Sequence, residues 1–137
     1  MIRSFVFLAA GFVLSACSAS SDSSKSATAT SAHLGAWQWV GVGAVRIADP
    51  ARYTLDFRPD GTVLVVADCN RGQGSYRIDA GRLTIDRPGL TKVGCGSKSR
   101  DREFIESIIQ AKAFAPAGDR LQVELAGGER MEFARAR

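Results

Sequence analysis

The sequence contains very little histidine and cysteine. Its 137 residues include one histidine, His33, and three cysteines, Cys17, Cys69 and Cys95. A structural zinc site needs four cysteine or histidine ligands at close spacings, and a catalytic thiol needs a neighbouring base, usually histidine. The composition therefore argues against a metal centre and against a cysteine–histidine relay. We expect a protein that has no cofactor and no enzymatic activity.

The sequence also lacks a basic stripe and a long hydrophobic run. Lysine and arginine cluster over residues 92–102, but Asp101, Glu103 and Glu106 lie among them or close by. Such a mixture is typical of a solvated face of mixed charge, so we expect no nucleic acid partner. The longest hydrophobic run, residues 5–13, is much shorter than the roughly 20 residues that a membrane-spanning helix needs.

The N-terminal residues have the layout of a secretory signal. Arg3 precedes the hydrophobic run, and the run leads into the residues LSAC, which end at Cys17. These four residues resemble the lipobox of bacterial lipoproteins, where the signal is cut just before a cysteine that carries lipid. We therefore predict a lipoprotein signal peptide over residues 1–16 and lipidation at Cys17, which would anchor the protein to a membrane.

The following segment is expected to be a tether. It is rich in serine, alanine and threonine and has no large hydrophobic side chain, so it cannot bury enough surface to offset the entropy cost of ordering. We predict a flexible tether over residues 17–33 and a single domain over residues 34–137. Ser18, rather than aspartate, follows the cysteine, which in the Gram-negative sorting rule favours the outer membrane. The expected location is the cell envelope, on the outer membrane and facing the periplasm.

Alternating hydrophobic residues predict a series of short strands in the domain. The strands are expected near residues 37–40, 53–57, 62–68, 75–79, 83–85, 121–125 and 131–133. Turn residues separate them, most clearly in the sequence RPDG that ends at Gly61. For Trp37 and Trp39 we expect one side chain in the core and the other facing outward or toward a neighbouring strand.

The hydrophobic period changes to that of a helix after Ser99. Phe104, Ile105 and Ile108 are spaced for one helix face, and Ser99 or Asp101 is expected to cap the helix start. We predict one main helix over about residues 100–112, with its hydrophobic stripe packed on the sheet. Strands followed by one helix and further strands indicate a mostly β, α+β domain with an antiparallel sheet.

Cys69 and Cys95 are the cysteines left to the domain if Cys17 carries lipid. An even pair in an exported domain favours a disulfide. Cys69 is in phase with Val63 and Val65, so we expect its side chain to point inward at the strand end. A redox-active pair is the alternative, since Arg71 could lower the pKa of a thiol, but no other member of a relay is visible.

A glycine-rich stretch follows Cys69. Asn70, Gly72 and Gly74 are expected to form a turn, since asparagine and glycine accept left-handed backbone angles. Arg71 is expected to be solvated. The stretch lacks the Gly-Lys-Ser/Thr ending of a phosphate-binding loop and joins two strands, so we do not interpret it as a nucleotide site.

The residues around Cys69 resemble the signature of META domains, the family of HslJ-like bacterial envelope lipoproteins. Cys69 and Asn70, followed by Arg71, Gly74 and Tyr76, resemble the family pattern C-N-x-x-x-G-x-Y. The resemblance extends over residues 37–135, which is nearly the whole domain.

Two further motifs carry the same resemblance. Thr91, the first residue of TKVGC, begins a segment similar to the family's T-x-M-A-C, with valine and glycine in place of methionine and alanine. Asp101 and Phe104 lie where META domains have a helix that begins E-x-x-F-L, with aspartate in place of glutamate. These departures concern packing or capping more than chemistry.

The resemblance implies a small, mostly β, partly open barrel that carries a helix. It also implies a non-enzymatic role in envelope integrity or in tolerance of stress, including heat and the antibiotic novobiocin, through binding of an envelope protein or a hydrophobic ligand. We expect the domain to be monomeric. The main alternative is an inhibitor lipoprotein that blocks lysozyme or another envelope hydrolase, and a thiol–disulfide enzyme is a third possibility.

Overall fold

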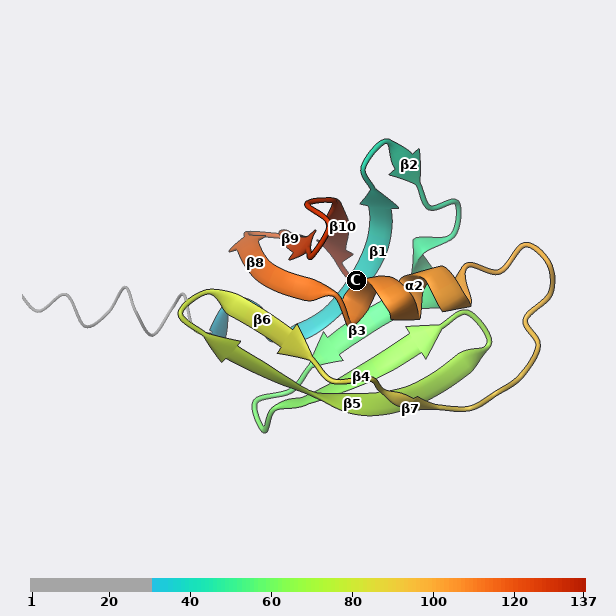
Figure 1. The fold of residues 1–137 in the computed structure, drawn as a ribbon, viewed down its shortest axis with the longest axis horizontal. Coiled ribbons are helices and arrows are strands. Elements are labelled where there is room, and N and C mark those ends of the chain that lie inside the picture. Colours follow the sequence, from blue (N-terminus) through green and yellow to red (C-terminus); the bar gives the residue numbers. More distant parts are fainter. Residues whose placement is uncertain (1–30) are drawn as a thin grey trace, which may run out of the picture.

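The computed structural model describes residues 31–137 (Figure 1). The predicted signal peptide, Cys17 and most of the predicted tether lie outside these residues. None of the helices within them is long and apolar enough to cross a membrane. In chain order the elements are β1 (Gly35–Val42), β2 (Val45–Arg46), the 3-10 helix η1 (Pro50–Arg52), β3 (Tyr53–Phe57), β4 (Thr62–Ala67), β5 (Asn70–Asp79), β6 (Arg82–Ile85), β7 (Gly89–Leu90), α2 (Asp101–Ile108), β8 (Ala111–Ala117), β9 (Arg120–Leu125) and β10 (Arg130–Arg135).

The strands form a closed antiparallel barrel of eight strands. Their order around the ring is β1, β3, β4, β5, β6, β8, β9 and β10, and pairing of β10 with β1 closes it. The predicted mostly β domain with an antiparallel sheet and one main helix is thus confirmed, although the barrel is closed rather than partly open. Closure removes exposed strand edges from the ring. The seam between β6 and β8 is narrow, with Arg82 opposite Ala113 as its one paired position.

The barrel interior is filled by aromatic and aliphatic side chains. Trp37 and Trp39 are both fully buried, so the expectation that one of them faces outward was wrong. Residues two apart on a strand point to the same face, which here is the core face of β1. The Trp39 ring stacks on Phe104 of α2 at a centroid distance of 5.3 Å, and Tyr53 meets Phe104 edge-on at 5.7 Å. Through these contacts α2 packs against core side chains of β1 and β3.

The helix is shorter than the sequence predicted. α2 ends at Ile108, and residues 111–117, which begin in the predicted helix, form strand β8. β8 pairs along its length with β9, from Ala111 opposite Leu125 to Ala117 opposite Arg120. This pairing outweighs the helix propensity of alanine and lysine. The N-cap position is Arg100, which makes no side-chain capping hydrogen bond, so the expectation that Ser99 or Asp101 caps the helix was wrong. The nearby Ser99 Oγ accepts a hydrogen bond from the Asp101 amide at 3.2 Å.

The described domain begins before the expected boundary at residue 34. His33, assigned to the tether from sequence, is only 7% exposed. Its ring makes edge contacts with Phe57, Tyr76 and Phe114, and its carbonyl accepts a hydrogen bond from Trp37 Nε1 at 2.7 Å. His33 thus joins the entering chain to the barrel, and Arg135 adds hydrogen bonds to the carbonyls of Ala32 and Leu34. The serines and alanines around His33 conceal this attachment in the sequence.

The signature stretch, residues 70–74, was predicted to form a turn but belongs to strand β5. β4 and β5 are joined by a two-residue turn of Asp68 and Cys69, with Ala67 opposite Asn70. Asp68 takes the positive φ of 61°, which breaks the alternation of β4 and leaves Cys69 exposed rather than pointing inward. Asn70 is buried instead, at 5% exposure. Asp68 is buried too and pairs with Arg52.

The glycines of the signature stretch allow another segment to lie very close to β5. β7 pairs with β5 opposite Gly72, and a Cβ built on Gly72 would lie 1.8 Å from the Gly89 carbonyl oxygen. At Gly74 the nearest atom to such a Cβ is the Asp86 carbonyl oxygen, at 3.1 Å. Neither glycine has a positive φ, so close approach of the backbone, rather than a left-handed turn, requires them.

Replacement of Gly72 by alanine is therefore expected to destabilise the domain. The Cβ would force β7 away from β5, at a cost of about 1–3 kcal/mol, the usual range for overpacking. The loss is limited because β7 has only two residues and can peel away from β5. Urea unfolding measures the change, and Gly94→Ala, where an added Cβ meets nothing within 4 Å, serves as the control. Equal stability of the two variants would contradict the close approach of β7 to Gly72.

Candidate functional site

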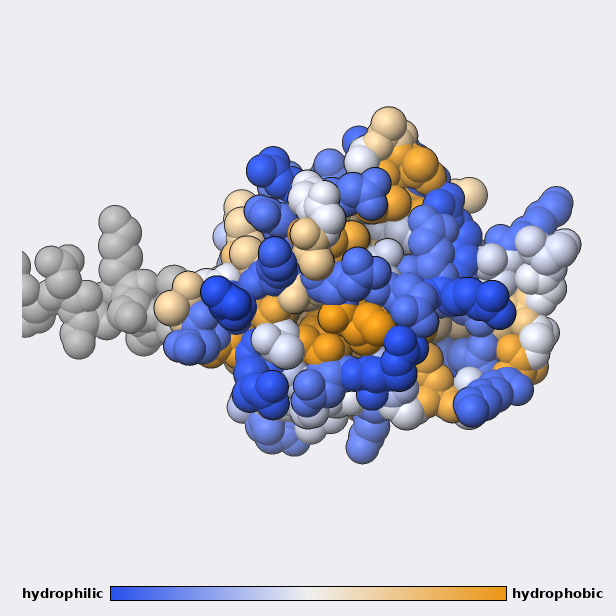
Figure 2. Space-filling model, in the orientation of Figure 1, coloured by the Kyte–Doolittle hydropathy of each residue, from blue (hydrophilic) through white to orange (hydrophobic). Residues whose placement is uncertain are grey.

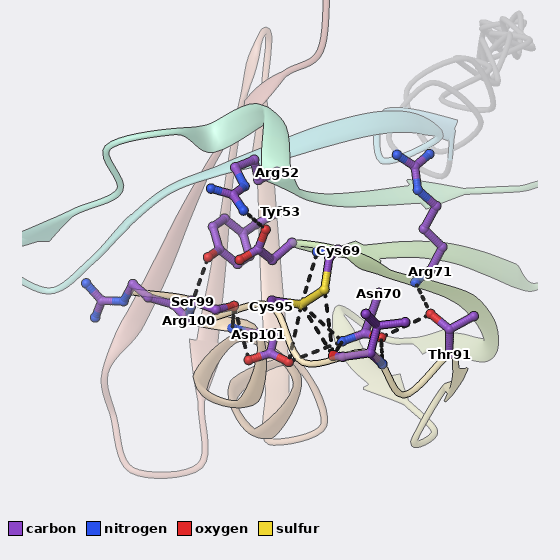
Figure 3. The surroundings of a disulfide bond; sticks show 12 residues. Arg52, Tyr53, Cys69, Asn70, Arg71, Thr91, Cys95, Ser99, Arg100 and Asp101 are labelled. Carbon is purple, nitrogen blue, oxygen red and sulfur yellow. Dashed lines mark hydrogen bonds and ion pairs between the residues drawn. A yellow bond between two sulfur atoms is a disulfide. The ribbon is translucent and has the colours of Figure 1, made fainter. Parts of the chain in front are cut away.

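A disulfide joins Cys69 to Cys95 at one end of the barrel (Figure 3). Its sulfur atoms are 1.98 Å apart, and the two residues are 26 positions apart in sequence. The bond connects the β4–β5 turn to the segment that leads into α2. The disulfide favoured from the sequence is therefore present in the structure, and it fixes a long connection that has little secondary structure of its own.

Asn70 holds the same connection by hydrogen bonds. Its Oδ1 accepts from the Val93 amide at 2.8 Å and from the Thr91 hydroxyl at 3.1 Å. Its Nδ2 donates to the Val93 carbonyl at 3.0 Å and lies 3.3 Å from Asp101 Oδ2. The side chain thus satisfies both backbone groups of Val93, as a neighbouring strand would, while it also reaches the first residue of α2 (Figure 3).

The remaining signature residues extend this attachment. Thr91 Oγ1 accepts a hydrogen bond from the Arg71 amide at 3.1 Å, and the Thr91 amide donates to the Arg71 carbonyl at 3.1 Å. The Arg71 side chain is not part of these contacts. On the other side of the disulfide, Tyr53 Oη accepts from the Arg100 amide at 2.9 Å, which fixes the start of α2.

Tyr76 lies farther along β5, within the core. Its hydroxyl donates to the Arg58 carbonyl at 2.6 Å and is 3.1 Å from His33 Nε2. Burial raises the pKa of Tyr76 above its ordinary value, and the charge of Asp60 adds to the effect. Tyr76 is therefore a neutral phenol at physiological pH. Its hydroxyl connects β5 to Arg58, after β3, and to His33, before β1.

An open groove of about 500 Å³ lies between the attached connection and α2. One wall is formed by residues 90–93, and the other by one face of α2, which includes Arg102 and Ile105. Ala67 and Asn70 line the groove from the ends of β4 and β5. Figure 2 shows hydrophobic residues between α2 and β7, bordered by hydrophilic residues on both sides. We call this feature the α2 groove.

The α2 groove is bordered by basic residues. Arg87 forms two hydrogen bonds with the carboxylate of Glu106, at 3.1 and 3.2 Å, and so links the β6–β7 connection to the helix. Lys92 and Arg102 are exposed, and neither forms an ion pair with another residue of the described range. The groove therefore combines a partly apolar lining with two unpaired positive charges.

The link between Arg87 and Glu106 predicts the titration of Glu106. Hydrogen bonds from Arg87 hold the pKa of Glu106 below its ordinary value of 4.5, and the charges of Arg87 and Arg102 lower it further. The stabilising interaction is therefore complete near neutral pH and is lost as the pH falls through this lowered pKa. Arg87→Gln is expected to raise the pKa of Glu106 in an NMR titration of its carboxyl carbon. Arg77→Gln is the control, and an unchanged Glu106 midpoint in Arg87→Gln would contradict the link.

The structure brings the predicted site residues together only in part. Cys69, Asn70, Thr91 and Cys95 form one cluster. Gly74 and Tyr76 lie outside it: Gly74 is close to the Asp86 carbonyl oxygen, and Tyr76 is part of the barrel core. The α2 groove and the pair formed by its residues Arg87 and Glu106 could not be recognised in the sequence, because their contact joins segments 19 positions apart. Within residues 31–137, no group of three histidine, cysteine or acidic residues is arranged to hold a metal ion.

The comparison with protein families identifies the domain. The family model described as "META domain" matches residues 30–137. The chain belongs to the META domain family. This confirms the resemblance found in the sequence motifs, and the closed barrel with its signature cluster is thus the fold of a META domain. No curated protein matches the chain.

Solved structures share the fold of this META domain. A protein from Burkholderia xenovorans, determined by NMR, is 17% identical, with a TM-score of 0.63 over 93% of this chain and 99% of its own. A DUF4847 family protein from Bacteroides vulgatus is 18% identical, with a TM-score of 0.56 over 74% of this chain and 92% of its own. At these identities the likeness concerns the fold alone.

Proposed function

We propose that this META domain is a non-enzymatic, lipid-anchored component of a bacterial cell envelope that acts by binding. Its contribution is to envelope integrity or to tolerance of heat and antibiotics. The observation that carries the proposal is the use of the signature residues. Cys69, Asn70 and Thr91 are all engaged in holding residues 91–95 against the barrel, which supports a role as a scaffold for a binding surface.

The architecture supports binding at the surface. The barrel interior is packed with large side chains, among them Trp37, Trp39, Phe57 and Phe133, all at most 2% exposed. The α2 groove, by contrast, is open, has a partly apolar lining and is bordered by cations. A shallow site of this composition suits an envelope protein or an amphipathic ligand better than a small substrate that must be enclosed.

A genetic test addresses the proposal. A host strain that lacks the gene is expected to die faster at elevated temperature and in novobiocin, and the full-length gene should restore survival. Cys17→Ala, which removes the predicted lipidation site, is expected to restore survival only partly or not at all. Lys112→Glu, on the exposed side of β8, serves as the control and should restore it fully. Normal survival of the deletion strain under both stresses would contradict the proposal.

The inhibitor alternative leads to a different result in a lytic assay. A hydrolase inhibitor would slow lysis of bacterial cells by lysozyme when the purified protein is added. Our proposal instead expects undiminished lysis with several lysozymes, because it assigns the binding surface to a partner of the host envelope. A stoichiometric reduction of lysis would favour the inhibitor and would overturn this part of the proposal.

A further inference from the structure

We propose that the α2 groove binds an extended acidic peptide segment, which adds as a strand to the chain at residues 90–92. This inference rests on the proposed binding function and names the partner's chemistry. It depends on three features of the described residues: an unpaired backbone edge, a partly apolar lining and two unpaired cations. Together they match a peptide that alternates acidic and hydrophobic residues.

The backbone edge follows from the pairing of β7 with β5. In an antiparallel pair, successive residues direct their N–H and C=O groups alternately toward the partner strand and away from it. The Thr91 amide donates to the Arg71 carbonyl at 3.1 Å, so Thr91 faces β5. The backbone groups of Leu90 and Lys92 on either side of it therefore point away from β5. β7 itself pairs only with β5 among the described strands, and such an edge can accept a further strand.

This edge is rigid because the signature residues hold it. The disulfide to Cys95 and the hydrogen bonds from Asn70 to Val93 fix the segment just after the edge. A fixed edge loses little conformational entropy when a peptide binds, so more of the contact energy is available for affinity. The attachment of residues 91–95 thereby acquires a role in binding as well as in folding.

The lining and the charges determine which peptide fits. In an extended peptide, side chains alternate between two faces, so one face can contact Leu90 and Ile105 while the other stays at the rim. Lys92 lies on one wall and Arg102 on the other. Acidic side chains at the rim would pair with both. The nearest acids are already engaged, Glu106 with Arg87 and Asp101 with Asn70 and Ser99.

Fluorescence anisotropy with a labelled seven-residue peptide of alternating glutamate and valine tests the proposal on the purified full chain. We expect saturable binding that weakens about tenfold in Lys92→Glu/Arg102→Glu, as expected for the loss of two exposed ion pairs. The matched variant Lys112→Glu/Arg120→Glu reverses two exposed charges on β8 and β9 and should bind like the wild type. Thermal unfolding checks that both variants remain folded.

A second peptide tests the strand addition itself. The same sequence with N-methyl groups on the alternate residues whose N–H groups would face residues 90–92 keeps its charge and valines but loses the backbone donors on that edge, and it should not bind measurably. Equal binding of the methylated peptide would overturn strand addition, and equal weakening in the matched variant would reduce the effect to general charge attraction. Failure of the unmethylated peptide to bind, with anionic lipid vesicles binding in its place, would assign the groove to lipid.

The genetic test separates this inference from the function on which it rests. If the deletion strain is sensitive to stress and the peptide does not bind, only the peptide inference fails. If the deletion strain survives normally, the proposed function fails whatever the peptide does.

Discussion

Removal of the disulfide is expected to cause the largest loss of stability. Replacement of Cys69 and Cys95 by serine should lower the free energy of unfolding by about 3.5 kcal/mol, from the chain entropy of a loop of this length. The bond closes a loop of 26 positions, and the unfolded chain gains the corresponding freedom when the bond is absent. This loss is a large fraction of the roughly 5–15 kcal/mol that stabilises most domains.

Urea unfolding with and without reductant measures the effect. The wild type in reductant should approach the stability of the double-serine variant. Cys17→Ser should match the stability of the wild type in each of the two conditions, because it keeps the Cys69–Cys95 bond. A loss below about 1 kcal/mol would mean that residues 91–95 are held mainly by other contacts and that the bond is not a structural staple.

Replacement of Asn70 by alanine is expected to have the second largest effect. The substitution removes the side-chain partner of both backbone groups of Val93 and the acceptor of the Thr91 hydroxyl. A buried group left without a partner costs about 1–3 kcal/mol. For the three groups we expect a total at the lower end, about 3 kcal/mol, because Thr91 and Val93 are exposed and their polar groups can form hydrogen bonds with water instead. The loss should be accompanied by faster amide hydrogen exchange of residues 91–95.

Two further variants sharpen this test. Thr91→Val removes one of the hydrogen bonds to Asn70 and should cost less than Asn70→Ala. Combination of Asn70→Ala with the double-serine change should cost less than the sum of the two, because both attach the same segment. Strict additivity would contradict the view that Asn70 and the disulfide serve one purpose.

Much of the barrel could be predicted from the sequence because its strands alternate cleanly. Tyr53, Leu55 and Phe57 all face the core, as their spacing predicts. The same rule applied to Trp37 and Trp39 gives two buried residues. Strand β8 escaped prediction because alanines and Lys112 favour a helix locally, and only pairing with β9 decides its conformation.

The signature cluster could be predicted only in part. The disulfide follows from the count of cysteines once the domain is predicted to be exported, but the role of Asn70 does not, since its partners lie more than twenty positions away. The positive φ of Asp68 shifts the phase of the strand by one residue, so Asn70 faces inward in place of Cys69. A shift of one residue reverses which side chains face the core, and this shift places Asn70 against residues 91–93.

The most direct test of the structural role of the disulfide is the intact mass of the protein after extraction from the cells of its native host. The protein is treated with an alkylating reagent without reductant, and again after reduction. We expect no alkylation of Cys69 or Cys95 at first and two added groups after reduction, which would support a lasting attachment of residues 91–95. Alkylation of both cysteines without reductant would contradict this account and would make the Cys69 turn a candidate reactive site.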